Sequence, residues 1–435
     1  MSGPNNPSEI RFVHARRVWD SRGHPTLEAE VRLHGGVVGR AMVPAGASKG
    51  THEALELRDG GHPFGGLDVQ RAVAHVNGEI AHAMMGMAAN DQAALDDRLI
   101  ELDGTPNKTR LGANALLAVS MAAAHAAATA HGVPLYQYLG GPDAALLPTP
   151  QVQIFGGGAH AGRRTDVQDF MVVCPGAKSF SQAIEWTAEV YRHAGLLMHA
   201  RGASFGVADE GGWWPVFNTN EQALEALVAS IERARFVPGE QVAIALDIAA
   251  SDFGKGGRYT LGLERRELDS DGMIELLVRW IEKYPIVSIE DPLVEDDLEA
   301  FARFTRAVGG KLQVVGDDLL VSNPTLLRQA TAAGAANTVL LKPNQRGTLS
   351  ETLQCWQAAR AGGYAGIVSA RSGETEDTTI AHLAIGWHVG QLKVGAFARS
   401  ERMAKWNEVL RIEERLGARA RYAGISAFGR NPPGR

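Results

Sequence analysis

The chain has only two cysteines among its 435 residues, Cys174 and Cys355, and both lie in apolar or helical stretches. Two such cysteines do not form a disulfide framework, so we expect the protein to fold in the reducing cytoplasm. An uninterrupted run of 18 apolar residues is also absent, and the first residues, MSGPNNPSE, contain no apolar segment. A membrane-spanning helix and a signal peptide are therefore disfavoured.

An excess of basic charge is also missing from the sequence. The formal net charge is −6 and no block of lysine and arginine occurs, which argues against nucleic acid or a membrane as partner. Hydrophobic residues make up 45% of the chain and charged residues 21%, values typical of globular proteins, so extensive disorder is not expected. A chain of this length can bury one large core and a smaller second one.

Patterning divides the chain into two parts. Residues 10–40 alternate as strands do, and Ala-rich helical patterns follow at 69–87 and 114–130, which predicts an α+β domain over residues 1–142. The second part, residues 143–435, has two short strands, two helical stretches and then six strand–helix units. This order predicts a closed barrel of the (β/α)8 type. An open doubly wound sheet is the alternative, but no G-x-G-x-x-G follows a first strand.

Three carboxylates each follow a short apolar run that is typical of a buried strand. They belong to Asp247, Glu290 and Asp317, and their separations of 43 and 27 residues leave room for a helix and a return strand. The carboxyl ends of parallel strands joined in this way meet at one rim of a barrel. Carboxylates gathered there repel one another and lose water, so a divalent cation is their natural partner.

The next three strand ends carry basic residues, namely Lys342, Arg371 and Lys393. One arc of the rim is therefore acidic and the facing arc basic, which favours a site where a cation and an anionic substrate meet. A lysine beside a metal and other cations has reason to lose its proton and act as a base. Removal of a proton next to a carboxylate yields an enediolate, which a divalent cation stabilises.

The segments around these residues resemble those of the enolase family. In chain order they are ARRVWDSRGHPTLEAEV, VPAGASKGTHEALELRDG, DEGG, IALDIAASDF, VSIEDPL, VGDDLL, LLKPNQ, SARSGETEDTTIAHLA and GQLKVGAFARSERMAKWNEVLRIEE. The resemblance covers about residue 10 to residue 417 with similar spacing. It implies a ββαα(βα)6 barrel with an N-terminal α+β cap domain, usually as a homodimer. It also implies lysine and magnesium chemistry on a small anionic phospho-carboxylic acid.

The resemblance further implies a metal site and a base. Asp247, Glu290 and Asp317 would bind one Mg²⁺, and Ser48 would bind a second Mg²⁺ that arrives with substrate. Lys342 would remove the proton alpha to the substrate carboxylate.

The remaining roles concern the leaving group and the anionic ends of the substrate. Glu210 would protonate the departing hydroxyl, and His160 would close over the site. Substrate binding is assigned to Lys393, Arg371 and Ser372.

The sequence departs from the enolase pattern close to the expected site. Enolases read SHRSGETEDT, whereas this chain has Ala370 in place of the histidine. The family's Gln-Glu pair is here Gln168-Asp169. Gln168 is retained and would lie near substrate, whereas Asp169 has a shorter side chain than the glutamate and would tune the protonation of Glu210. Trp213 and Trp214 replace a smaller apolar pair, and packing is the simpler interpretation of them.

Four cations have appeared near the loops that cover the site, at Lys49, Arg163, Arg164 and Arg346. Together with the space left by Ala370, they predict a substrate with more anionic groups than 2-phosphoglycerate. The hypothesis is therefore a divergent magnesium-dependent enzyme of the enolase family, of the carboxyphosphonoenolpyruvate synthase type. Such an enzyme acts in the biosynthesis of phosphonate antibiotics, on a phosphonate substrate that can be nucleotide-activated.

Three alternatives stay open. The first is glycolytic phosphopyruvate hydratase, which converts 2-phosphoglycerate to phosphoenolpyruvate. The second is a non-catalytic binding protein, a role that would need neither Lys342 nor Glu210. The third is a racemase or dehydratase from elsewhere in the superfamily, which the GETEDT and RSER segments disfavour.

Overall fold

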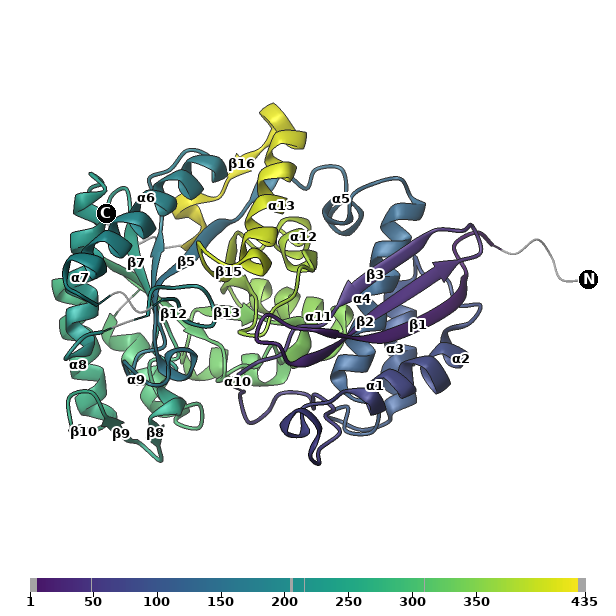
Figure 1. The fold of residues 1–435 in the computed structure, drawn as a ribbon, viewed down its shortest axis with the longest axis horizontal. Coiled ribbons are helices and arrows are strands. Elements are labelled where there is room, and N and C mark those ends of the chain that lie inside the picture. The colour runs from purple at the N-terminus through teal and green to yellow at the C-terminus, as the bar shows by residue number, and fades with distance from the viewer. Residues whose placement is uncertain (1–5, 48, 204–205, 215, 309, 429–435) are drawn as a thin grey trace, which may run out of the picture.

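A computed structural model describes the chain at residues 6–47, 49–203, 206–214, 216–308 and 310–428. The molecule is elongated, with a three-stranded sheet and its helices at one end and a β/α barrel at the other (Figure 1). This arrangement confirms the predicted combination of an α+β cap and a closed barrel.

The cap begins with an antiparallel sheet in the order β1-β2-β3. Its strands are β1 (Ile10–Trp19), β2 (Pro25–Leu33) and β3 (Val38–Met42), as the alternation over residues 10–40 predicts. The long helix α4 (Ala113–Ala130) lies against β2 and β3, and Gly39 makes this close approach possible. A Cβ atom at Gly39 would lie 2.1 Å from the Ala122 carbonyl oxygen of that helix.

Helix α4 is long and apolar enough to cross a membrane by length and composition. In the structure, however, 83% of its 18-residue window is buried inside the protein. Its apolar residues face the cap sheet on one side and the barrel on the other, which makes it a core helix.

The single helix expected over residues 69–87 is instead divided. It consists of α1 (Gln70–His75), a π-helical turn η2 (Val76–Ile80) and α2 (Ala81–Met84), because the backbone shifts to i→i+5 bonding in the middle. The sequence analysis missed α3 (Gln92–Asp103). The Asp91 side chain caps the start of α3 by accepting from the Ala94 backbone N–H at 3.1 Å.

Eight strands close the barrel in the order β11-β12-β13-β14-β15-β5-β6-β7, which excludes the open doubly wound sheet. The strands are β5 (Thr149–Gly156), β6 (Asp169–Val173), β7 (Ala243–Asp247), β11 (Ile286–Glu290), β12 (Gln313–Gly316), β13 (Thr338–Leu341), β14 (Ala365–Ser369) and β15 (Gln391–Ala396). Only β6 runs antiparallel to both of its neighbours among these strands. Because β6 runs the other way, its first residue lies at the rim where the other strands end.

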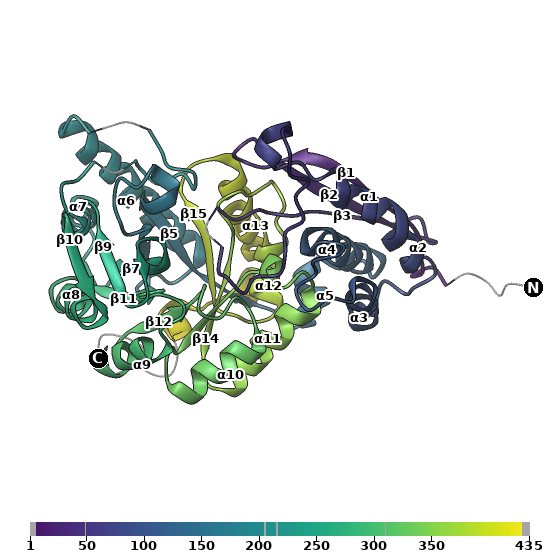
Figure 2. The same ribbon diagram turned by 90° about the horizontal axis from the view of Figure 1, so that it is seen from below.

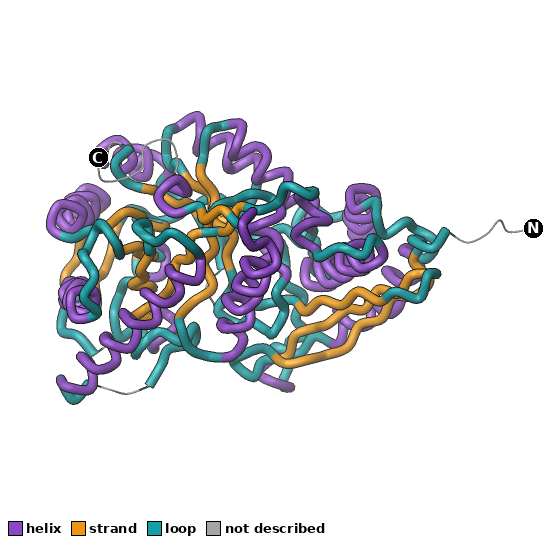
Figure 3. Tube along the Cα trace, turned by 90° about the horizontal axis from the view of Figure 1, so that it is seen from above, coloured by secondary structure: helices purple, strands orange, loops and turns teal. Residues whose placement is uncertain are grey.

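Helices surround the barrel as an outer ring (Figures 2 and 3). They are α6 (Phe180–Ala200), α7 (Asn220–Arg233), α8 (Ser270–Lys283), α9 (Leu298–Val308), α10 (Pro324–Ala333), α11 (Leu349–Ala361), α12 (Thr379–Gly386) and α13 (Ser400–Leu416). Helix α8 buries one face with Met273, Leu276, Leu277 and Trp280, whereas α12 is buried along its whole length. The short α5 (Leu135–Gly140) links cap and barrel, and β4 (Leu146–Leu147) pairs with β16 (Arg421–Tyr422).

A small antiparallel sheet between β7 and α8 is also absent from the sequence prediction. It is formed by β8 (Gly254–Lys255), β9 (Arg258–Leu261) and β10 (Arg266–Asp269). Its strands have two or four residues each, too few for a periodic pattern to be recognised.

Strand register gathers the predicted acids at one rim. Asp247 pairs with Glu290 on one side and with Asp169 on the other. The cap reaches the same rim, because the backbones of Ala45 and Gly373 exchange two hydrogen bonds of 2.8 Å. The cap and the strand ends of the barrel therefore enclose a common space.

Candidate active site

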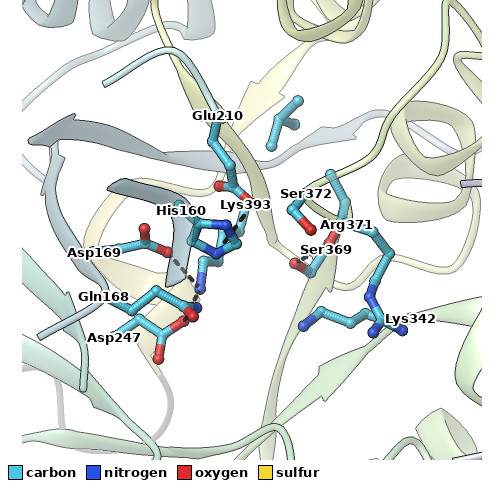
Figure 4. Close-up of a pocket in the computed structure, with 12 residues that line it drawn as sticks. His160, Gln168, Asp169, Glu210, Asp247, Lys342, Ser369, Arg371, Ser372 and Lys393 are labelled. Atoms are coloured by element: carbon cyan, nitrogen blue, oxygen red, sulfur yellow. Dashed lines mark hydrogen bonds and ion pairs between the residues drawn. The ribbon is translucent and has the colours of Figure 1, made fainter. Parts of the chain in front are cut away.

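A cavity lies at this rim, beneath the cap (Figure 4). The residues that line it are His160, Gln168, Asp169, Glu210, Asp247, Lys342, Ser369, Ala370, Arg371, Ser372, Lys393 and Val394. Its free volume is about 20 Å³, room for one water molecule. A substrate therefore requires side chains in the cavity to exchange their present partners for it.

Lys393 lies at the centre of the acidic arc. Its Nζ is 2.7 Å from Asp247, 2.8 Å from Glu290 and 3.3 Å from Asp169. Burial lowers the pKa of Lys393, but these carboxylates outweigh burial and raise it well above its usual value. Burial and the neighbouring Asp247 raise the pKa of Glu290 despite this lysine. Lys393, predicted to hold the substrate carboxylate, thus binds three carboxylates of the protein itself.

Lys342 and Asp317 form a second buried pair, through Lys342 Nζ and Asp317 Oδ2. Burial alone would raise the pKa of Asp317 and lower that of Lys342, but their attraction dominates and reverses both shifts. With Asp317 as its partner, Lys342 therefore holds its proton firmly, and the loss of this proton beside a bound metal stays a prediction. Its proton is retained as long as Asp317 is its partner.

The three predicted metal ligands lie around one space, but their oxygens are not clustered for a single ion. Among the described residues, the one group of acids with ligand oxygens within 4.8 Å of one another is Asp291, Asp317 and Asp318. Asp291 is already used, because its oxygens accept the backbone N–H groups of Asp317 and Asp318 at 3.0 and 2.7 Å.

The donor set nevertheless fits magnesium. Asp247, Glu290 and Asp317 are all buried, and Oε1 of Glu290 has no hydrogen-bond partner among the described residues. Hard carboxylate oxygens in such surroundings are what Mg²⁺ binds. An ion there would compete with Lys393 and Lys342 for the same oxygens.

Glu210 and His160 line the side of the cavity that lies across from Lys342 (Figure 4). His160 Nε2 is 4.0 Å from Glu210 Oε1, and both side chains are buried. The main chain of Glu210 is fixed by the Ala396 N–H, which donates to its carbonyl oxygen at 2.9 Å. Gly395 allows this approach, because a Cβ there would lie 2.9 Å from the same oxygen and its φ is +115°.

Gln168 and Asp169 lie where they were predicted. The Gln168 amide donates to Asp247 Oδ2 at 2.9 Å, and Asp169 accepts from the Gln153 amide. Gln153 also accepts the Gly212 N–H at 2.8 Å, two residues beyond Glu210. The shortened carboxylate is thus tied through Gln153 to the segment that carries Glu210.

Arg371 and Ser372 form the basic side of the cavity. Glu53 of the cap binds Arg371 with both oxygens, at 2.9 and 3.1 Å, and both side chains are buried. Burial lowers the pKa of Arg371, but Glu53 raises it well above its usual value. The Ala47 N–H donates to the Ser372 hydroxyl at 2.7 Å, and Arg22 donates to it at 3.3 Å.

Two of the added cations are neutralised away from the cavity. Lys49 Nζ is 2.6 Å from Glu56, and its side chain is 45% exposed. Arg346 is 2.9 Å from Glu351, which also binds the buried Lys108 at 2.6 Å. Neither Lys49 nor Arg346 lines the cavity.

The other two cations lie on the loop that carries His160. Arg163 donates to the Asp252 carbonyl oxygen at 2.9 Å, and Arg164 is exposed; neither lines the cavity. Ser48, the predicted ligand of a second magnesium, lies outside the described residues.

Trp213 and Trp214 contact protein. The Trp213 ring stacks on Tyr191 at 5.0 Å, and its Nε1 donates to the Tyr191 carbonyl at 2.9 Å. Neither tryptophan lines the cavity, which supports the packing interpretation.

The sequence analysis missed several residues that contact or support the site. Ser369 and Val394 line the cavity beside residues that were predicted. Glu53, Gln153 and Gln345 bind cavity residues or Asp317 through their side chains. Gln345 belongs to the LLKPNQ segment, so its position three residues after Lys342 was the available signal.

The rim brings together buried carboxylates, two lysines and, across the cavity from Lys342, a glutamate, which are the groups that a lyase acting beside a carboxylate needs. Comparison with known proteins is consistent with this class. The family model "Enolase, N-terminal domain" matches residues 10–139, and "Enolase, C-terminal TIM barrel domain" matches residues 144–431. The chain belongs to the enolase family. It is 52% identical over 422 residues to a protein named Enolase from Rubrobacter xylanophilus. The aligned region covers 97% of this chain and 98% of the relative.

Proposed function

We propose that the protein is a phosphopyruvate hydratase, which converts 2-phosphoglycerate to phosphoenolpyruvate. The observation that carries this proposal is that Lys342 and Glu210 lie on opposite sides of one cavity (Figure 4). Loss of water across a C–C bond needs a base on one side and an acid on the other. The relative named Enolase, similar over nearly the whole chain, supports the same reaction.

Lys342 removes the proton alpha to the substrate carboxylate. It can accept a proton only after its attraction to Asp317 is weakened, since this pair raises its pKa. Mg²⁺ held by Asp247, Glu290 and Asp317 would supply positive charge to the substrate carboxylate. Lys393 then turns from its three carboxylate partners to the same end of the substrate.

Glu210 protonates the hydroxyl that leaves from C3. The nearby His160 and the burial of both side chains support this transfer. Asp169 acts indirectly, because Gln153 connects it to the segment of Glu210.

Arg371 and Ser372 bind the phosphate. Arg371 presents a planar, permanently charged group of the kind that recognises phosphate with two hydrogen bonds. In the structure Glu53 occupies that group, so phosphate must replace or share this partner.

A phosphonate substrate is less well supported. The added cations at Lys49, Arg163, Arg164 and Arg346 do not line the cavity, so the charge argument loses its basis. Two departures do line it, Asp169 and Ala370, and Ala370 is the one that leaves space for a different substrate. If Ala370 tunes the pocket for 2-phosphoglycerate, Ala370→His will change its KM; if histidine leaves kcat and KM unchanged, this residue has no part in substrate choice.

The test of the proposed function is a direct assay. Phosphoenolpyruvate formation from 2-phosphoglycerate with Mg²⁺ is expected, together with exchange of the alpha proton with deuterated solvent. Lys342→Ala should abolish both, whereas Lys311→Ala, which removes an exposed lysine, should leave them unchanged. If the wild type forms no phosphoenolpyruvate, the proposed reaction is wrong. If proton exchange survives in Lys342→Ala, Lys342 is not the base.

A role as a non-catalytic binding protein is tested by the same measurements, because it predicts neither exchange nor Mg²⁺ binding. The homodimer and the cytoplasmic location also stay proposals that rest on the family and on the two buried cysteines. Sedimentation of the purified protein tests the dimer.

A further inference from the structure

Gln345 lies three residues after Lys342, in the short turn η5 (Pro343–Gln345), and its side chain is completely buried. Its amide nitrogen donates to Asp317 Oδ1 at 2.8 Å, and its amide oxygen accepts from the Ser322 hydroxyl at 2.6 Å. Gln345 does not line the cavity, so it does not contact substrate. It does contact the carboxylate that Lys342 also holds.

The hydrogen bonds around Gln345 all run in one direction. The Lys342 backbone N–H can only donate, and at 2.9 Å it makes the Ser322 oxygen an acceptor. The single Ser322 proton then goes to the Gln345 oxygen, which is closer than the carbonyls of Leu340 and Lys342 at 3.4 Å. The amide is thereby oriented with its NH₂ group toward Asp317, whose ionised carboxylate only accepts.

The contact between Lys342 Nζ and Asp317 Oδ2 closes these bonds into a ring. The ring contains the main chain and side chain of one residue, Lys342, and the side chains of Ser322, Gln345 and Asp317. It fixes the two oxygens of Asp317 to different partners, and it fixes Lys342 at both ends. A change at Gln345 therefore reaches both the metal ligand and the base.

The turn that carries Ser322 is strained in a way that supports this ring. Val321 and Ser322 have φ values of +40° and +52°, a region that costs a β-branched residue of order 1–3 kcal/mol. The turn is held by the N–H groups of Leu320 and Val321, which both donate to the Asp317 carbonyl at 3.0 and 2.7 Å. This turn places the Ser322 hydroxyl within hydrogen-bond distance of the Lys342 backbone N–H.

We propose that Gln345 is a positioning residue that holds Asp317 ready to bind metal while keeping Lys342 aligned with substrate. Without the amide, Asp317 Oδ1 would lie buried and unpaired, and the carboxylate would turn both oxygens toward Lys342. Asp317 would then bind metal less well, and Lys342 would lose its fixed position beside it. The kinetic part of this proposal rests on the proposed function, whereas the metal part rests on the carboxylate geometry alone.

The variant Gln345→Met removes both hydrogen bonds and keeps the length of the side chain. Its affinity for Mg²⁺, measured by titration calorimetry with MgCl₂ alone, should fall by about 10-fold or more, as for other residues that orient metal ligands. The rate of alpha-proton exchange should fall by a similar factor. The KM for 2-phosphoglycerate should change by less than about threefold, because Gln345 does not contact substrate.

Gln313→Met is the matched control. Gln313 is buried in the same barrel, in β12, and neither its amide nitrogen nor its oxygen has a partner among the described residues. This variant should retain wild-type Mg²⁺ affinity and exchange rate. Ser322→Ala should weaken both, and the double variant with Gln345→Met should be little worse than Gln345→Met alone, because the two residues act in one chain.

The outcomes separate this inference from the proposed function. Unchanged Mg²⁺ affinity and exchange rate in Gln345→Met overturn it, whatever the wild type does with substrate. If the wild type does not turn over 2-phosphoglycerate, a loss of Mg²⁺ affinity in Gln345→Met but not in Gln313→Met still supports it. If Gln345→Met does not fold, Ser322→Ala decides the question. If Gln345→Met folds, additive effects of Gln345→Met and Ser322→Ala in the double variant count against the ring.

Discussion

His382 should make the protein lose stability in acid. It lies in α12 at the contact between cap and barrel, stacked on Tyr136 of α5 at 6.1 Å and edge-on to His125 of α4 at 6.4 Å. Burial, and to a lesser extent His125, lower the pKa of His382 from 6.5 to about 3, although Glu408 lies 3.5 Å away. Between about pH 6.5 and pH 3, His382 is therefore neutral in the folded protein but protonated in the unfolded chain.

The sign and size follow from this shift. A group with a lowered folded pKa gives up stability as the pH falls below its unfolded pKa, so the loss begins near pH 6.5 and continues to about pH 3. At about 1.4 kcal/mol for each pH unit, the loss at pH 4.5 is roughly 2.7 kcal/mol. His125, whose pKa burial also lowers, contributes in the same direction.

The measurement is the free energy of unfolding in urea at pH 7 and at pH 4.5. His382→Gln removes the titrating ring, so the difference between the two pH values should shrink by about 2.5 kcal/mol. His82→Gln, at an exposed position of the cap, should leave the difference unchanged. Equal differences in the wild type and in His382→Gln would refute the reasoning.

Three further predictions concern one buried and two partly buried carboxylates. Asp96→Asn should steepen the loss of stability in acid by about 2 kcal/mol between pH 7 and pH 4.5, since burial raises the pKa of Asp96 to about 6 and acid relieves this cost. Glu53→Gln should lower the free energy of unfolding by about 3 kcal/mol in urea and tighten phosphate binding in calorimetry, because Arg371 loses the carboxylate that binds it with two hydrogen bonds. Glu351→Gln should cost a similar amount in urea, because it leaves Lys108 buried and unpaired. Equal pH dependence of stability in the wild type and Asp96→Asn would contradict the first prediction. Unchanged phosphate affinity in Glu53→Gln would contradict the second, and an unchanged urea midpoint in Glu351→Gln would contradict the third.

Most barrel strands could be predicted because a short apolar run leads to a polar residue at the rim. Lys393 differs from the prediction, since it lies inside β15 and not at its end. Asp247, Glu290 and Lys342 lie at strand ends within a residue of the expected positions. The direction of β6 does not follow from its own residues, since DFMVV buries every side chain whichever way the strand runs. Pairing with its neighbours decides it.

The partners of the charged residues were harder to predict. Lys393 and Asp247 are 146 residues apart, and only the closed barrel brings them to 2.7 Å. Likewise, Lys49 and Arg346 were predicted to bind substrate because of their charge. In the structure they form ion pairs with Glu56 and Glu351. The spacing of strands in the sequence identifies which charged groups lie at the rim. The length and direction of their side chains in the folded barrel decide which of them form ion pairs.

The reversed strand β6 has a consequence for how the catalytic pocket can change. Both ends of the segment between β5 and β6 emerge at the mouth, so residues 157–168 form a flap anchored on two adjacent strands. Asp166, near the end of this flap, is bound on both its N–H and its carboxylate by Asn220 at the start of α7, so changes in length are accommodated best in the part of the flap before Asp166. New substrate preferences could therefore evolve there at little expense to the stability of the barrel.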